Sequence, residues 1–133
     1  MTDLELIQTA IEARKRAYAP YSGFFVGAAL LAADGRVFTG CNIENAAFTP
    51  TNCAERTAFF KAVSEGVRAF EAIAVVGGKG EEPSEFCAPC GVCRQVMAEF
   101  CSPDFRVILG NENNQTVYTL SELLPASFSK SDL

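Results

Sequence analysis

The chain has 133 residues, enough for one domain with a hydrophobic core. Apolar residues make up 49% of it and charged residues 20%, a composition that is typical of globular rather than disordered proteins. Its net charge of −5, without a dense basic run, argues against nucleic acid as a partner and favours a small neutral ligand. No apolar run is long enough to cross a bilayer, and the N-terminus lacks the basic start and apolar run of a signal peptide. We therefore expect no membrane partner and a cytoplasmic location, where the six cysteines stay reduced.

The predicted elements alternate between helices and strands. Thr2 and Glu5 form a capping box that begins a first helix, which should end before Pro20. Asp34-Gly35 between two apolar runs predicts a β-hairpin. In chain order we then expect strands from Phe25 to Ala33 and from Arg36 to Thr39, a helix from Asn52 or Cys53 to Glu65, a strand from Ala72 to Val76, a helix from Cys90 to Phe100, strands from Arg106 to Leu109 and from Thr116 to Tyr118, and a short helix from Ser121 to Leu124.

This order of elements predicts an α/β fold. A hairpin followed by alternating helices and strands forms one sheet of mixed direction with helices on both faces. We expect a three-layer α/β/α arrangement with a mixed five-stranded sheet, in a single domain that spans residues 1–133.

The stretch CAPCGVCR, residues 87–94, contains two overlapping C-x-x-C pairs. Cys90 and Cys93 begin one predicted helix and share a face of it, and Cys53 begins another. Helix N-termini favour thiolates, and a tetrahedral thiolate set suits Zn²⁺. Three other interpretations stay open at this point: a redox dithiol, an incidental pair, or a closed structural zinc site that includes Cys87.

The triplet Cys53-Ala54-Glu55 distinguishes between these interpretations. Zinc deaminases are the class defined by H-x-E or C-x-E followed by P-C-x-x-C, with the glutamate as proton shuttle rather than ligand, so the mechanism is taken over from that class. Residues 89–93, PCGVC, match the second part, whereas Cys87 follows Phe86 and lies before the helix. Because the sequence contains no histidine, the predicted site is the three-cysteine form with one Zn²⁺ per chain.

With these motifs the chain resembles the small cytidine deaminases that act on free nucleosides, within the cytidine and deoxycytidylate deaminase family. The matching segments are residues 24–29 (FFVGAA), 40–46 (GCNIENA), 53–58 (CAERTA), 89–95 (PCGVCRQ) and 123–128 (LLPASF). The resemblance implies hydrolytic, zinc-dependent deamination of cytidine and 2′-deoxycytidine to uridine and 2′-deoxyuridine plus ammonia, in pyrimidine salvage.

The resemblance also implies a role for each site residue. Glu55 would be the catalytic proton shuttle, and Arg56 would donate hydrogen bonds to the ligand sulfurs. The other implied roles are zinc ligation by Cys53, Cys90 and Cys93, contact with the base by Phe24 and Ala54, and binding of the ribose hydroxyls by Asn42 and Glu44.

The family pattern further suggests a homotetramer in which Ala46, Phe48 and Phe128 contact the pocket of a neighbouring subunit. Two residues depart from that pattern: Phe48 stands where tyrosine is frequent, and the extra Cys87 has no assigned role.

Three other functions deserve comparison with this one. A deaminase of another nucleoside analogue is disfavoured by the N-x-E ribose motif at Asn42 and Glu44. A deaminase of bases within a polynucleotide is disfavoured by the acidic charge balance. A non-catalytic zinc or dithiol protein would have no need of Glu55.

Overall fold

The computed structural model describes residues 1–84 and 86–133. The first helix, α1 (Asp3–Arg14), begins at the predicted capping box. The Thr2 hydroxyl accepts a hydrogen bond from the Glu5 N–H at 3.1 Å, and the Glu5 carboxylate accepts one from the Thr2 N–H at 3.0 Å. The helix ends well before Pro20, as predicted.

The five predicted strands form one sheet, in the order β2-β1-β3-β4-β5. Only the β3–β4 pair is parallel, and the other pairs are antiparallel, so the mixed sheet is confirmed. The strands are β1 (Phe25–Ala32), β2 (Val37–Cys41), β3 (Phe70–Gly78), β4 (Arg106–Gly110) and β5 (Gln115–Thr119); the helices that follow α1 are α2 (Ala54–Ser64), α3 (Gly91–Phe100), α4 (Leu120–Leu123) and a final 3-10 turn, Lys130–Asp132.

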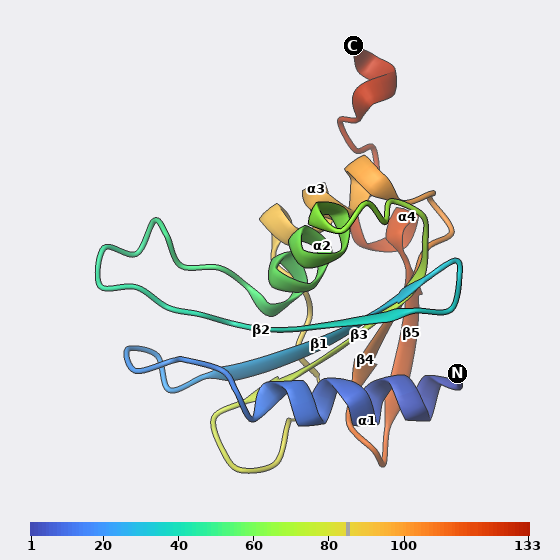
Figure 1. Ribbon diagram of the computed structural model, residues 1–133. Coiled ribbons are helices and arrows are strands. Elements are labelled where there is room, and N and C mark those ends of the chain that lie inside the picture. The colour runs from blue at the N-terminus through green and yellow to red at the C-terminus, as the bar shows by residue number, and fades with distance from the viewer. Residues whose placement is uncertain (85) are drawn as a thin grey trace.

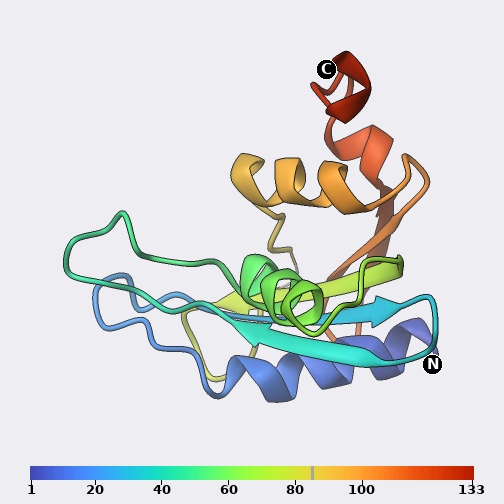
Figure 2. The same ribbon diagram turned by 45° about the horizontal axis from the view of Figure 1, so that its top comes forward.

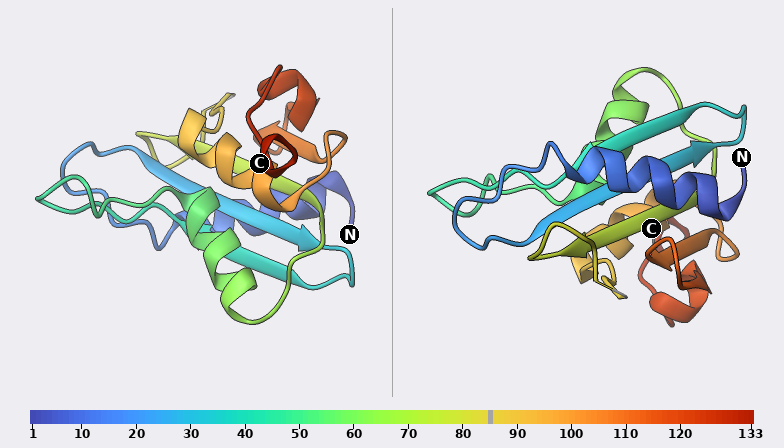
Figure 3. Two further views of the ribbon diagram at one scale, coloured as in Figure 1. Left: turned by 90° about the horizontal axis from the view of Figure 1, so that it is seen from above. Right: turned by 90° about the horizontal axis from the view of Figure 1, so that it is seen from below.

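The helices cover both faces of the sheet (Figures 1 and 2). Figure 3 shows α1 alone on one face and α2 and α3 side by side over the other. Two hydrophobic clusters fill the spaces between the layers, one with Phe59 of α2 and one with Ile7 of α1 at its centre. The three-layer α/β/α class is therefore confirmed. None of the helices in the described part of the chain is long and apolar enough to cross a membrane.

Helix α3 lies where it was expected, but its buried stripe differs from the apolar spacing in the sequence. Val92, Val96 and Phe100 recur every four residues, yet Val92 is 57% exposed. The side chains that face the sheet are Cys93 and Met97. This orientation turns Cys93 inward, toward the start of α2.

Candidate metal centre and substrate cleft

Three thiols meet where α2 and α3 begin. The Sγ atoms of Cys53, Cys90 and Cys93 all lie within 4.8 Å of one another, and those of Cys53 and Cys90 are 3.7 Å apart. Tetrahedral zinc with Zn–S bonds of about 2.3 Å holds its sulfurs about 3.8 Å apart, so the spacing fits. The cluster therefore fits one zinc ion per chain, with three protein ligands and a fourth position left for another group.

The local backbone explains why these cysteines converge. Cys53 and Cys90 are the N-cap residues of α2 and α3, both with extended backbone angles, and neither side chain caps its own helix. Each sulfur thus stays beside the positive end of a helix, which stabilises a thiolate.

Hydrogen bonds among Cys53, Cys93 and Arg56 change the pKa of each of these side chains. A hydrogen bond from Cys93, together with one from Arg56, lowers the pKa of Cys53 to about 5, while the same bond to Cys53 raises the pKa of Cys93. Arg56 Nη2 donates to Cys53 Sγ at 3.2 Å. Burial alone would lower the pKa of Arg56, but its bonds to the two sulfurs raise it above its ordinary value. Arg56 therefore has the contact that the resemblance implied, and it offsets negative charge on the sulfurs.

Glu55 lies in the first turn of α2 with only 4% of its surface exposed. Burial raises the pKa of its carboxyl to about 7, and the negative charge of Cys53 adds to the rise. A carboxyl that gains and loses a proton near neutral pH can act as both general acid and general base.

The cluster opens onto a cleft of about 350 Å³. Its lining contains all four residues predicted to bind substrate within their own chain, together with the predicted proton shuttle and two of the predicted zinc ligands: Phe24, Asn42, Glu44 and Ala54, with Glu55, Cys53 and Cys90. Cys87, for which the resemblance implied no role, also lines the cleft, and the lining residues that no motif indicated are Ser22, Val26, Thr51, Asn52 and Ala88. Thr51 and Asn52 are the two residues before Cys53, a predicted zinc ligand, which is the one signal that could have indicated them.

Asn42 is 9% exposed and already has two backbone partners. Its Nδ2 donates to the Phe24 carbonyl at 2.8 Å, and its Oδ1 accepts from the Val26 N–H at 2.9 Å. Because an amide has two N–H groups and two oxygen lone pairs, Asn42 can bind a hydroxyl as well.

Glu44 is also held in place. Its Oε1 accepts hydrogen bonds from the backbone N–H groups of Tyr21 at 3.0 Å and Ser22 at 3.1 Å, and its Oε2 accepts one from the Ser22 hydroxyl. The hydrogen bond from the Ser22 hydroxyl, with the backbone bonds, lowers the pKa of the Glu44 carboxyl, so it is an acceptor at neutral pH.

Cys87 lies in the cleft wall but outside the three-sulfur cluster. Its sulfur sits over Gly77 of β3, in the space that a Cβ would fill. Burial raises the pKa of this thiol to about 11, with the charges of Glu55 and Cys53 adding to the effect. At neutral pH Cys87 is therefore a protonated wall residue.

Ala46, Phe48 and Phe128 lie outside the lining of this chain's cleft. Phe48 and Phe128 are 71% and 61% exposed, and Phe48 has a φ of 63°, unusual for a residue with a side chain. Figure 1 shows the segment between β2 and α2, which carries Phe48, extending beyond the sheet. The Phe128 carbonyl accepts a hydrogen bond from Gln95 Nε2 at 2.8 Å, which ties the C-terminal segment to α3.

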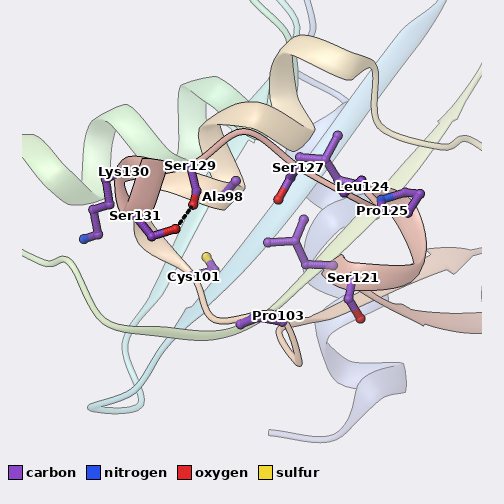
Figure 4. A pocket seen from close by; sticks show the side chains of 12 residues that line it. Ala98, Cys101, Pro103, Ser121, Leu124, Pro125, Ser127, Ser129, Lys130 and Ser131 are labelled. Atoms are coloured by element: carbon purple, nitrogen blue, oxygen red, sulfur yellow. Dashed lines mark hydrogen bonds between the residues drawn. The ribbon is translucent and has the colours of Figure 1, made fainter. Parts of the chain in front are cut away.

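A larger hollow of about 600 Å³ lies between the end of α3 and the C-terminal segment (Figure 4). Leu120, Leu124 and several serines line it, and Ser129 and Ser131 are hydrogen-bonded at 2.7 Å on its rim. It contains none of the three clustered thiols, so the smaller cleft is the candidate site.

Comparisons with known proteins agree with this geometry. The profile described as "Cytidine and deoxycytidylate deaminase zinc-binding region" matches residues 1–110, which include all three clustered cysteines. The chain is 56% identical over 130 residues to a cytidine deaminase of Sporosarcina psychrophila, covering 97% of this chain and 93% of that protein. It is 55% identical over 129 residues to one of Halalkalibacterium halodurans, covering 96% and 95%. The crystal structure of a cytidine deaminase from Burkholderia pseudomallei superimposes with a TM-score of 0.88 at 51% identity, covering 96% of this chain and 100% of that one.

Proposed function

The chain belongs to the cytidine and deoxycytidylate deaminase family, and from this premise we propose that it hydrolyses cytidine and 2′-deoxycytidine to uridine and 2′-deoxyuridine plus ammonia. The observation that carries the proposal is the buried Glu55 carboxyl, which lines the same cleft as the thiols of Cys53 and Cys90. A hydrolase acting on a cyclic amidine needs such a proton carrier beside its metal.

Each residue has a defined task in this reaction. Zinc held by Cys53, Cys90 and Cys93 would lower the pKa of a bound water molecule, so that hydroxide is available near neutral pH to attack C4 of cytosine. Glu55 takes a proton from the attacking water and delivers it to N3 of the base. Glu55 then takes the second proton from the hydroxyl now bound to C4 and delivers it to the amino group, so that the C4–N bond breaks, the C4 carbonyl forms and ammonia departs. Arg56 withdraws charge from the sulfurs through its hydrogen bond to Cys53.

Other residues of the cleft lining orient the substrate. Phe24 packs against the base, Ala54 lies against it near the metal, and the remaining hydrogen-bonding capacity of Asn42 and Glu44 binds ribose hydroxyls. A nucleoside without the 3′-hydroxyl, which cytidine and 2′-deoxycytidine share, would leave Asn42 or Glu44 without that hydrogen-bond partner, so it should be a poor substrate.

The proposal extends to the whole protein. Residues 1–133 act as a single domain, and the protein is a cytoplasmic homotetramer of pyrimidine salvage in which Ala46, Phe48 and Phe128 reach a neighbouring subunit's cleft. The support is that Phe48 and Phe128 are large apolar side chains, mostly exposed, on segments that leave the body of the chain.

Loss of the cytosine absorbance band measures the activity directly. The wild-type protein should convert cytidine in a zinc-dependent manner, and Glu55→Gln should reduce the rate by at least about 100-fold with zinc content unchanged, because the amide cannot carry the proton. Glu99→Gln, an exposed glutamate of α3, serves as the control. An active Glu55→Gln variant would overturn the mechanism. An inactive wild type with one zinc per chain would point to another amino-bearing nucleoside as substrate.

A further inference from the structure

Arg14, the last residue of α1, is a buried cation that binds backbone carbonyls. It is 7% exposed, and its Nε donates to the Phe25 carbonyl at 2.8 Å. Its Nη1 donates to the Glu81 carbonyl at 2.8 Å, and its Nη2 donates to the carbonyls of Gly78 and Gly80, both at 2.6 Å. The ion pairs found among the described residues involve other side chains. A guanidinium that uses four hydrogen bonds on carbonyls fixes the path of the backbone.

The first of these carbonyls belongs to a wall of the substrate cleft. Phe25 follows Phe24, which lines the cleft. The same stretch of backbone is held from its other side by Asn42, through its bonds to Phe24 and Val26. The start of β1 is thus held by hydrogen bonds from two side chains, Arg14 of α1 and Asn42, which follows β2.

The other three carbonyls lie on the segment that leads to Cys87, whose sulfur lies against Gly77 of β3 beside the Phe24 ring. Gly78, Gly80 and Glu81 are at the end of β3 and just beyond it, and the chain continues from there to Cys87 and Ala88 in the cleft. Figure 1 shows this segment passing beside the C-terminal end of α1. One side chain therefore holds the start of β1, next to Phe24, and the end of β3, next to the Gly77 backbone on which Phe24 and Cys87 pack.

Close packing of α1 on the sheet places Arg14 at this junction. A Cβ at Gly27 of β1 would lie 2.1 Å from the Ala10 carbonyl oxygen and 2.5 Å from the Arg14 nitrogen. Because Phe25 pairs with Gly78 across β1 and β3, their carbonyls lie within reach of one guanidinium. The glycine allows this close approach, and the strand pairing brings the two targets together.

We propose that Arg14 is a positioning residue for substrate binding, which sets the separation of Phe24 from the segment that carries Cys87. This inference rests on the proposed function. Arg14 should affect binding more than the metal, because the start of α3 has its own anchor: Arg94 donates to the Pro89 carbonyl at 2.8 Å and to the Leu123 carbonyl at 2.7 Å.

The test compares Arg14→Ala and Arg14→Lys with Arg16→Ala, an exposed arginine two residues further on. We expect a KM for cytidine raised about tenfold in Arg14→Ala and less in Arg14→Lys, whose ammonium retains some of the carbonyl bonds. The kcat per bound zinc should stay within about threefold of the wild-type value. If Arg14→Ala fails to fold, Arg14→Lys carries the test alone. If the Arg14 variants keep the wild-type KM and only the fraction of active molecules falls, the proposal is overturned, because a residue that serves folding alone would give that result.

A double-mutant cycle tests whether the effect passes through Phe24. In a Phe24→Ala background the Arg14→Lys change should raise KM by clearly less than it does in the wild type, because the side chain that Arg14 positions is gone. Equal effects in both backgrounds would refute the route through Phe24. An inactive wild type and an inactive Arg16→Ala variant would instead signal failure of the proposed function.

Discussion

At the scale of single residues, Cys87 and Cys90 are chemically identical and three positions apart, yet their surroundings differ. Cys90 belongs to the three-sulfur cluster, whereas Cys87 packs over Gly77 with its pKa raised to about 11. We predict that Cys90→Ala loses nearly all zinc and activity, because two thiolates bind the ion poorly. Cys87→Ala should retain one zinc per chain. Zinc analysis of the two purified variants checks this, and zinc loss in both would show that Cys87 is a ligand.

The sequence predicted some of these residues better than others. The convergence of Cys53, Cys90 and Cys93 is confirmed, because the C-x-E and P-C-x-x-C spacings are local and specific. The backbone contacts of Asn42 were not predictable, since its partners Phe24 and Val26 are 18 and 16 residues away. Such contacts depend on strand pairing, which no short motif encodes. The substrate contacts of Asn42 and Glu44 stay predictions.

At the scale of elements, α2 lies directly on β2 at Gly40. A Cβ there would lie 2.3 Å from the Ala54 carbonyl oxygen and 2.6 Å from the Ala58 nitrogen. We predict that Gly40→Ala pushes the first turn of α2 outward, lowering the free energy of unfolding by about 1–3 kcal/mol and lowering activity through displacement of Glu55. Gly80→Ala is the matched control, because its Cβ would meet only ordinary contacts at 3.9 and 4.0 Å. Urea unfolding and turnover of both variants measure the difference, and equal stability would contradict the close packing.

Element types followed from local signals, whereas element lengths did not. The capping box at Thr2 and the Asp34-Gly35 turn identified the first helix and the hairpin correctly. Strand β3 was predicted to end at Val76, but it continues through Gly77 and Gly78 because these residues pair with Val26 and Phe25. Glycine has low strand propensity, so only the partner strand could reveal the extension.

At the scale of the whole molecule, the cluster would join two helices by metal bonds. We predict that removal of zinc with a chelator lowers the melting temperature by about 10 °C, since an ion that binds only the folded state stabilises it by mass action. Calorimetry of zinc-loaded and chelated protein measures the shift. The Cys90→Ala variant is the control and should melt at the same temperature with and without chelator. If the wild-type protein melts at the same temperature with and without chelator, the cluster holds no metal.

The separation of the ligands along the chain has a consequence for the order in which the molecule matures. Cys53 and Cys90 are 37 residues apart, and β3 lies between them. On a ribosome Cys53 would emerge well before its partners, so early metal capture could involve only one thiolate and would be weak. Tight capture must wait until α3 has emerged and β3 has paired with β1, which makes metal acquisition a late event that follows formation of the sheet.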